Sequence, residues 1–409
     1  MEFSGKALDI LYAGTLPPHR GGSAISGSQL MIELSNTGHD IRCLGAITPG
    51  ELKSGDRFSK KYPDLHVTRF LLPFFETSPD IPPPVSYRKT EGDEIKKNMV
   101  TMIENKKPDI ILAGRETYAW HVPDIAIEYS VPCILRTAGS TTNGILNKTI
   151  PEDSAAKLIA QYKKFDLLIS PAKHLERSIK TLGVENIITI INAVDSDKFY
   201  PEDKDTRILS DLQINSSDFI AGHISNMKSI KRPFDIVDSA EIILKDYPHI
   251  IFLIVGDGNC LEEMKQRCRS KKIFDNFRFT GWLDYDLVPK YLNLFDLFIM
   301  PSSAEGLARV TLEAQACGKC LIASDIAPTH EVINHGETGL IFRLGDVRDL
   351  TEKILLAYRD DELRVKIGSN ARKRIHQHSI KYAAVKYVKV FREVIDNRKI
   401  YSSATIKAL

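Results

Sequence analysis

The sequence predicts an α/β protein built from two doubly wound domains, each a parallel sheet covered by helices. Short apolar, β-branched runs alternate with helical patterns along most of the chain, which is typical of βαβ units. A second series of such runs begins near residue 218, after a polar stretch. The 409 residues also exceed what one hydrophobic core usually holds, so we expect two domains.

The strands follow from the apolar runs in chain order. Between them lie helical patterns such as Ser26–Asn36, Glu91–Asn105 and Ala172–Leu182, and helical periodicity without further strands continues to Asn397. The predicted strands are ALDILYA, DIRCLGA, HVTRFLL, PDIILA, VPCILRT, FDLLIS and NIITII, followed by DFIAGHI, HIIFLIV, FRFTG, LFDLFIM, KCLIAS and TGLIF.

The polar, charged segment Asn192–Asp205 is the predicted linker. We place the first domain at residues 1–196 together with about 384–409, and the second at 197–383, with the C-terminal helices packing back toward the first domain. Two Rossmann-like domains joined in this way would face each other across a cleft, because ligands of such sheets bind at the carboxyl ends of the strands. The five prolines of Pro73–Pro84 predict an extended surface loop.

Composition and charge exclude several classes. A net charge of +2 gives no field for nucleic acid as the main partner. Residues 352–409 carry 14 basic and 6 acidic side chains, which favours a solvated helix face and leaves a weak peripheral contact with anionic lipid as the alternative. With no signal peptide pattern or membrane-spanning run, we expect a cytoplasmic protein, peripheral to the inner membrane face in the alternative case. Of the six cysteines, Cys317 and Cys320 form one CxxC, interpreted as a buried thiol pair beside a turn.

The most informative segment is PSSAEGLARVTLEAQACGKCLIASD, residues Pro301–Asp325. It follows an apolar strand, turns through small residues and enters a helix. A loop that opens a helix presents unpaired N–H groups and the positive end of the dipole, so it suits a phosphate or a sugar hydroxyl. Glu305 lies in this loop and Glu313 lies eight residues later in the helix. Both can therefore face the same site.

This segment, with HEVINHGETGLIF at His330–Phe342, resembles the Glu-x7-Glu region of the retaining glycosyltransferases of family 4, which have the two-domain GT-B architecture. Three weaker landmarks occur in the family's order: GGSAISGSQLMIELSNTGHDI, NAVDSDKF and GHISNMKSIKRPFDIV. The matched residues are Pro301, Ser302, Glu305, Gly306, Leu312, Glu313, Ala314, Ala316, Gly318, Ser324 and Asp325.

The resemblance implies a metal-independent, retaining transfer of a sugar from a nucleotide-sugar donor, held mainly by the second domain, to a hydroxyl acceptor held mainly by the first. Departure of a nucleotide diphosphate needs fixed positive partners. Lys231 is our first candidate for that role, and Glu305 is implied to lie near the transferred sugar as a positioning or electrostatic residue. The implied catalytic pair is thus Glu305 and Lys231. The further nucleotide-sugar-binding candidates are Gly21, Gly22, Lys228, Arg232, Trp282, Gly306, Leu307, Ala308, Arg309 and Glu313, the last assigned to the ribose hydroxyls.

The sequence departs from the family at three places. Ala138 stands where the family keeps a histidine, His223 follows Gly222 where an arginine is usual, and Leu307, Ala308 and Arg309 replace loop glycines. The string SNMKSIKR is closer to the branch of the N-acetylglucosaminyl-malate synthases, which favours a UDP-sugar and specifically a UDP-N-acetylhexosamine.

Other readings stay open at this point. Lys231 could be an ordinary helix-start cation, and Gly21 with Gly22 a plain turn. A nucleotide-sugar epimerase on the same fold, or an inactive GT-B scaffold, are the rival functions. The acceptor is a sugar, a lipid-linked sugar or a small molecule. The segments Asp195–Asp197, Asp203–Asp205 and Asp284–Asp286 spell Asp-x-Asp without the strand context of a metal site, so we expect no metal and no cofactor besides the nucleotide sugar.

Overall fold

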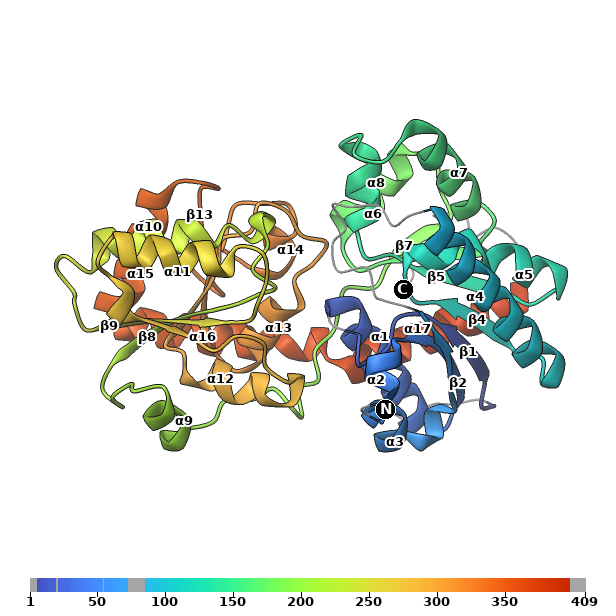
Figure 1. Cartoon of the computed structure of the whole chain (residues 1–409), viewed down its shortest axis with the longest axis horizontal. Helices are drawn as coiled ribbons and strands as arrows, with labels where there is room; N and C mark the ends of the chain where they lie inside the picture. Colours follow the sequence, from blue (N-terminus) through green and yellow to red (C-terminus); the bar gives the residue numbers. More distant parts are fainter. Residues whose placement is uncertain (1–5, 20, 54, 73–84, 398–409) are drawn as a thin grey trace. The chain divides into compact units, whose positions relative to one another are not determined.

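The computed structural model describes residues 6–19, 21–53, 55–72 and 85–397. The chain divides into two compact units (Figure 1). Unit 1 runs to Asn192 and resumes at Ile380, and unit 2 is Ala193–Ser379. The divisions lie at 192 and 380, beside the expected positions of 196 and about 384. The predicted proline-rich loop at Pro73–Pro84 lies outside the described residues.

The sheet of unit 1 contains seven described strands, and all of its pairings are parallel. Their order is β3-β2-β1-β4-β5-β6-β7, so the direction of winding reverses between β1 and β4. The strands are β1 (Asp9–Ala13), β2 (Asp40–Ile47), β3 (Val67–Leu71), β4 (Ile110–Ala113), β5 (Cys133–Arg136), β6 (Leu167–Ser170) and β7 (Ile187–Thr189).

Unit 2 repeats this plan with six described strands in the order β10-β9-β8-β11-β12-β13, again all parallel. Its reversal lies between β8 and β11. The strands are β8 (Phe219–Ile224), β9 (Ile250–Val255), β10 (Phe277–Phe279), β11 (Leu297–Met300), β12 (Cys320–Ser324) and β13 (Leu340–Phe342). The prediction of an α/β chain with two doubly wound sheets is confirmed.

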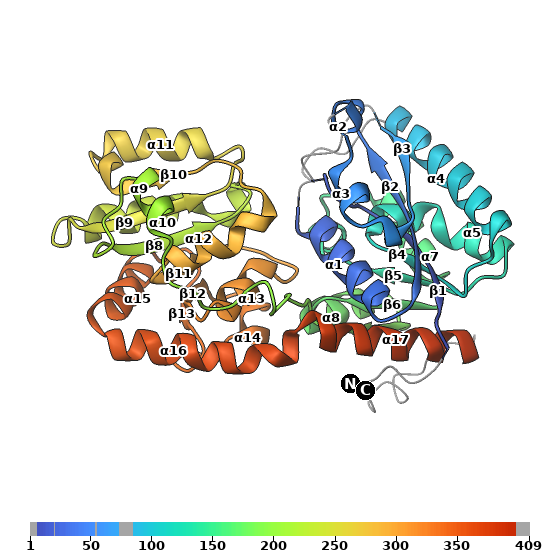
Figure 2. The same ribbon diagram turned by 90° about the horizontal axis from the view of Figure 1, so that it is seen from below.

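Helices cover both sheets, as Figure 2 shows from a second direction. In unit 1 they are α1 (Gly22–Asn36), α2 (Pro49–Lys53), α3 (Arg57–Lys61), α4 (Val85–Asn105), α5 (Val122–Glu128), α6 (Ser140–Leu146), α7 (Glu152–Tyr162), α8 (Lys173–Thr181) and α17 (Ile380–Asn397). In unit 2 they are α9 (Thr206–Asp211), α10 (Pro233–Ile243), α11 (Leu261–Ser270), α12 (Val288–Leu294), α13 (Arg309–Ala316), α14 (Thr329–Val332), α15 (Val347–Arg359) and α16 (Asp361–Arg374). The three-residue 3₁₀ helices η3 (Ser229–Lys231) and η5 (Tyr285–Leu287), and the five-residue η2 (Glu116–Trp120), lie in loops after strands.

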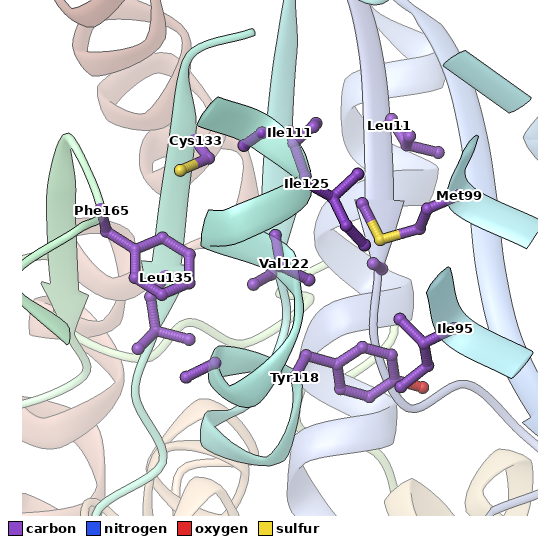
Figure 3. Close-up of a cluster of buried hydrophobic side chains, with 14 of the residues drawn as sticks. Leu11, Ile95, Met99, Ile111, Tyr118, Val122, Ile125, Cys133, Leu135 and Phe165 are labelled. Carbon is purple, nitrogen blue, oxygen red and sulfur yellow. The ribbon is translucent and has the colours of Figure 1, made fainter. Parts of the chain in front are cut away.

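The core of unit 1 explains why these runs form central strands (Figure 3). Every residue of β1 is buried, and Leu11 and Ile111 come from the adjacent strands β1 and β4. Ile95 and Met99, four residues apart on α4, belong to the same cluster. A continuous apolar strand is what a sheet with helices on both faces requires.

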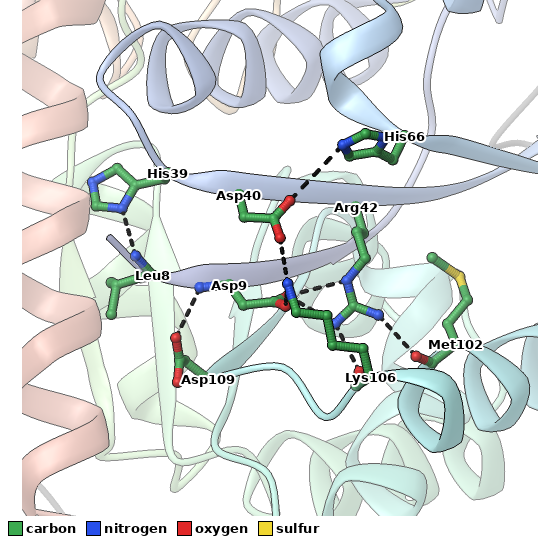
Figure 4. A network of polar contacts seen from close by, with 9 residues as sticks. All are labelled: Leu8, Asp9, His39, Asp40, Arg42, His66, Met102, Lys106 and Asp109. Carbon is green, nitrogen blue, oxygen red and sulfur yellow. Dashed lines mark hydrogen bonds and ion pairs between the residues drawn. The ribbon is translucent and has the colours of Figure 1, made fainter. Parts of the chain in front are cut away.

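The amino ends of β1 and β2 carry a charged network (Figure 4). Arg42 Nη2 lies 2.7 Å from Asp9 Oδ1, and Lys106 Nζ lies 2.7 Å from Asp9 and 2.5 Å from Asp40. Arg42 also donates to the carbonyl of Met102 at 2.8 Å, which fixes the end of α4. The hydrogen bond from Lys106 lowers the pKa of Asp40. Because ligands of such sheets bind at the opposite, carboxyl ends, we assign this network a structural role.

The C-terminal helix α17 belongs to unit 1, where it packs against α1. Arg392 of α17 donates to the carbonyl of Lys6 at 2.7 Å, just before β1. Helices α15 and α16 instead pack within unit 2, against α10 and β12 respectively. The expectation that the chain returns to its first domain therefore holds for its last described helix.

The predicted linker is partly packed rather than extended. Val194 and Phe199 are fully buried, and the N–H of Val194 donates to the carbonyl of His378 at 2.9 Å. The ring of Phe199 lies 5.7 Å from that of Tyr285. Two apolar residues are enough to pack this polar segment onto the rest of unit 2. The overall composition of the segment did not predict this packing.

Tyr12 occupies the reversal of strand order in unit 1. This buried residue of β1 lies close to Gly14, Gly27 and Gly114, and a β-carbon on any of the three would overlap its side chain. Gly14 follows β1, Gly114 follows β4 and Gly27 lies in α1. The glycines are therefore required because the Tyr12 ring leaves no room for a larger residue.

The variant Gly27→Ala should lower the thermal unfolding midpoint, because a new methyl group would collide with the Tyr12 hydroxyl and overpacking costs about 1–3 kcal/mol. Adding Tyr12→Phe should recover part of the loss. Gly22→Ala is the matched control, since nothing lies within 4 Å of its β-carbon and helix propensity favours alanine. Equal midpoints for Gly27→Ala and Gly22→Ala would contradict the described packing.

Candidate active site

Two loops meet where strand order reverses in unit 2. One follows β8 and contains η3, and the other follows β11 and leads into α13. They are joined by Ser303, whose N–H and hydroxyl both donate to the carbonyl of Ile230, at 2.8 and 3.2 Å. Because β8 and β11 are neighbouring parallel strands, their carboxyl ends lie at one edge and hold the two loops together.

The junction brings together the two residues predicted as the catalytic pair. Lys231 Nζ lies 2.5 Å from Glu305 Oε1, and their side chains are 15% and 13% exposed. Such a mostly shielded ion pair is costly to break on one side only, because the remaining charge is left uncompensated. The topology of the sheet therefore brings together Lys231 and Glu305, which are 74 residues apart in the sequence.

The other two predicted cations of this loop have different surroundings. Arg232 adopts a left-handed backbone conformation (φ 49°) and holds Asp235 through two hydrogen bonds of 2.7 and 3.0 Å. Burial raises the pKa of Asp235, and Arg232 opposes that shift. Lys228 precedes η3 at the start of the loop. The Arg232 side chain is thus paired with Asp235 in the first turn of α10, and phosphate binding by Arg232 or Lys228 stays a prediction.

The loop after β11 leads into a helix that is buried on nearly all sides. Gly306 is partly exposed, Leu307 is buried and Ala308 caps α13 through its backbone position. The N-cap residue Ala308 makes no side-chain hydrogen bond to this helix, and no acidic residue lies in the first turn of α13. Binding of an anion by the amide groups at this end stays a prediction.

Glu313 and Arg309 lie one turn apart on α13 and form a second buried pair. Arg309 Nη2 donates to Glu313 Oε1 at 3.0 Å and to the hydroxyl of Tyr285 at 2.8 Å. Tyr285 in turn donates to Glu313 Oε1 at 2.7 Å. We predicted Arg309 as a nucleotide-sugar-binding residue, and the structure places its guanidinium against Glu313. This contact orients the carboxylate assigned to the ribose.

Tyr285 is the residue that sequence reasoning missed. It lies in η5 after β10, and its ring also packs 4.2 Å below the ammonium of Lys198. The only signal in the sequence was its place in Asp284–Asp286, considered and rejected as a metal motif. Its meeting with Glu313, 28 residues later, depends on the tertiary fold.

The aspartates of the Asp-x-Asp segments serve local structure. Asp195 accepts from the N–H groups of Asp197 and Lys198, Asp205 caps α9, and Asp286 lies 2.5 Å from Lys198. In the described part of the chain, no three His, Cys, Asp or Glu side chains gather as a metal site would require. The six cysteines are free and buried, with Cys317 and Cys320 flanking the turn at Gly318.

The remaining predicted residues lie at other loops. Trp282 is exposed and follows Gly281, whose carbonyl accepts from Gly256 at 2.9 Å, so it stands at the carboxyl edge of unit 2. Gly21 and Gly22 belong to unit 1, at the start of α1. That helix begins four residues before the predicted Ser26. Gly21 has φ 130° and ψ 161°, a conformation essentially restricted to glycine.

At two of the positions that depart from the family, the structure shows defined hydrogen bonds. His223 is buried, its Nδ1 lies 2.8 Å from the carbonyl of Ile299, and its Nε2 lies 2.9 Å from Ser225 Oγ. A carbonyl only accepts, so Nδ1 carries the hydrogen and Nε2 accepts from the hydroxyl. In unit 1, Glu116 Oε1 accepts from the N–H groups of Ala138 and Gly139 at 2.7 and 2.9 Å.

The ion pair of Lys231 and Glu305 can be tested by unfolding. Lys231→Met or Glu305→Gln alone should destabilise unit 2 by about 3 kcal/mol, since each leaves a mostly buried charge unpaired. The double variant should lose less stability than either single variant. As a control, the exposed pair of Lys265 and Glu262 should give less than about 1 kcal/mol. A double variant as unstable as the sum of the singles would refute the pairing.

His223 makes stability depend on pH. Burial lowers its pKa to about 4, the bond to Ile299 opposes the shift and Lys231 adds to it. An unfolded histidine titrates near about 6.5, so on acidification the unfolded chain binds the proton first. Stability should therefore fall as pH drops from about 6.5 toward 4, by up to about 3 kcal/mol.

His223→Asn should remove this part of the pH dependence, because asparagine keeps a donor and an acceptor without titrating. A residual slope should remain from His39 and His121, whose pKa values are also lowered by burial. Urea unfolding at a series of pH values measures the difference. Identical slopes for the variant and the parent chain would contradict a neutral, buried His223.

The chain is similar in sequence to known glycosyltransferases. Residues 204–374 match the family model of the glycosyl transferases group 1. The chain is 24% identical over 369 residues to the N-acetyl-alpha-D-glucosaminyl L-malate synthase of Bacillus anthracis, covering 89% of this chain and 91% of the relative. It is 27% identical over 222 residues to a capsular polysaccharide biosynthesis glycosyltransferase of Staphylococcus aureus, covering 51% and 56%.

Solved structures share the fold. HepE of Anabaena, in complex with UDP and glucose, superposes with a TM-score of 0.76 at 17% identity, covering 94% of this chain and 99% of that one. Sucrose-phosphate synthase of Thermosynechococcus elongatus gives 0.78 at 16% identity, covering 95% and 99%. No described helix is both long and apolar enough to cross a bilayer. Residues 204–374 form a glycosyl transferases group 1 domain, and the chain is a glycosyltransferase with the GT-B fold.

Proposed function

We propose that the chain is a retaining, metal-independent glycosyltransferase that moves a sugar from a UDP-sugar to a hydroxyl acceptor. The favoured donor is a UDP-N-acetylhexosamine. The observation that carries the proposal is the contact of Lys231 with Glu305 near the start of α13, at the strand reversal of unit 2. Ligands of doubly wound sheets bind at such reversals.

The charge moved in the reaction explains the residue types. The bond between the sugar carbon and the diphosphate oxygen breaks, and its electron pair leaves with the phosphate. Lys231 and the amides of Gly306, Leu307 and Ala308 would stabilise that charge, since preorganised donors are worth most in a site shielded from water. Glu305 would hold the ammonium in position until the diphosphate replaces it, and would then face the sugar.

Retention of configuration would follow from attack on the face that the diphosphate leaves. The acceptor oxygen forms the new bond to the sugar carbon, and its proton passes to a departing phosphate oxygen. In this scheme Glu305 positions groups and stabilises positive charge at the sugar, without forming a covalent bond. The positive partners of the diphosphate come from the chain, so no step requires a metal ion.

The second buried pair supports a nucleoside site. Glu313 has one carboxylate oxygen held by Arg309 and Tyr285, which fixes the direction of the other. A fixed carboxylate can accept hydrogen bonds from two ribose hydroxyls. The uridine choice draws on the relatives: HepE was solved with UDP, and the Bacillus anthracis enzyme is named for an N-acetylglucosaminyl group.

Removal of the cation tests the proposal directly. Lys231→Ala should lower turnover of a UDP-sugar by about 100- to 1,000-fold, because one preorganised donor to the leaving group is lost. Lys271→Ala is the matched control: Lys271 is also paired, with Glu241 at 2.5 Å, but it precedes β10 at the amino edge of the sheet. Release of UDP and transfer to acceptor pools are measured together.

Binding of nucleotides separates the rival functions. UDP should raise the thermal stability of the chain, by about 2.7 kcal/mol at a hundredfold excess over its dissociation constant, whereas GDP and ADP should not. An epimerase would alter the donor with no acceptor present. In an inactive scaffold, Glu313→Ala would not change nucleotide binding. Stabilisation by GDP alone would refute the proposal of a UDP-sugar donor and would not affect the assignment to the family.

A further inference from the structure

Arg136 is an unusual cation at the carboxyl edge of unit 1. It is the last residue of β5, and its guanidinium reaches two helices. Nε donates to the hydroxyl of Tyr387 in α17 at 3.0 Å, and Nη2 donates to the hydroxyl of Ser26 in α1 at 3.3 Å. Tyr12 interacts with it electrostatically from β1. The side chain thus lies beside the strand reversal of this sheet.

All of these partners are neutral. Burial raises the pKa of Tyr12, so its phenol stays protonated and supplies no negative charge. In residues 6–19, 21–53, 55–72 and 85–397, no carboxylate forms an ion pair with Arg136, and its Nη1 is buried without a hydrogen-bond acceptor. The residue as a whole is partly exposed, although Nη1 itself is buried.

The buried acid at the same edge does not neutralise it. Glu116, which follows β4, uses Oε1 to accept from the backbone N–H groups of Ala138 and Gly139. A largely desolvated charge without a counter-charge costs free energy, and an apolar side chain of similar volume would pack as well. Structural support alone therefore does not explain an arginine at this position.

We propose that Arg136 binds an oxyanion of the acceptor, so that the acceptor carries a carboxylate or a phosphate group. This inference rests on the proposed function, in which unit 1 binds the acceptor. A guanidinium presents parallel N–H donors that match both oxyanions, and Tyr387 and Ser26 hold it in one orientation. The exposed glycines at the start of α1, Gly21 and Gly22, lie on a helix that Arg136 contacts.

Calorimetric titration of the full chain tests this, with inorganic phosphate in one arm and succinate in the other, each with and without UDP. Binding of phosphate alone identifies a phosphorylated acceptor, and binding of succinate alone a carboxylate. Arg136→Met should weaken the binding by about tenfold or more, because hydrogen bonds to a charged group are lost. Arg136→Lys keeps the charge and loses the paired N–H donors of the guanidinium. Its anion affinity should lie between those of the parent chain and Arg136→Met.

Thermal unfolding distinguishes this role from a structural one. Without anions, Arg136→Met should be at least as stable as the parent chain, because an unpaired charge is removed. A purely structural arginine predicts destabilisation with unchanged anion binding. Arg207→Met is the control, since that side chain is 85% exposed on unit 2 and should affect neither measurement.

The inference is overturned if neither anion binds the parent chain. It is also overturned if Arg136→Met and Arg207→Met change the anion affinity equally. UDP binding, followed in the same samples, keeps the two proposals apart. Failure of UDP to bind counts against the proposed function, whereas failure of the anions with UDP binding intact counts against Arg136 alone.

Discussion

The reversal of strand order between β8 and β11 is the constraint on which the site of unit 2 depends. Neighbouring parallel strands with reversed winding bring two loops to the same carboxyl edge, and the bonds from Ser303 to Ile230 hold these loops together. Only then can Lys231 meet Glu305. Unit 1 has the same reversal between β1 and β4, where the Tyr12 ring packs against three glycines and Arg136 lies beside it.

Much of the fold could be predicted because parallel strands are buried on both faces and show up as apolar runs. The ends of elements were harder to predict. Helix α1 begins at Gly22, whereas the helical spacing of apolar residues becomes recognisable in the sequence only from Ser26, because the first turn of a helix does not need that spacing. The docking of the segment around Phe199 could not be predicted from composition, because two buried residues outweigh many exposed polar ones.

Of the site, the sequence predicted the residues that lie within one continuous motif. Glu305 and Glu313 share a loop and its helix, and Lys231 follows β8 as the resemblance required. Tyr285 carried no comparable signal, since its role arises only when η5 and α13 meet. Arg309 lies against Glu313 for a local reason, because residues four apart share a helix face. The pairing of charges therefore needed the structure, even where each charge was anticipated.

The return of α17 to unit 1 has a consequence for synthesis on the ribosome. Unit 1 is interrupted by residues 193–379, so its last helix emerges only after all of unit 2 has been translated. At about 5–20 residues per second this delay is on the order of 10–40 s. During that interval the nascent first unit lacks Tyr387 and leaves the surface of α1 uncovered, whereas unit 2 is continuous and can finish folding first.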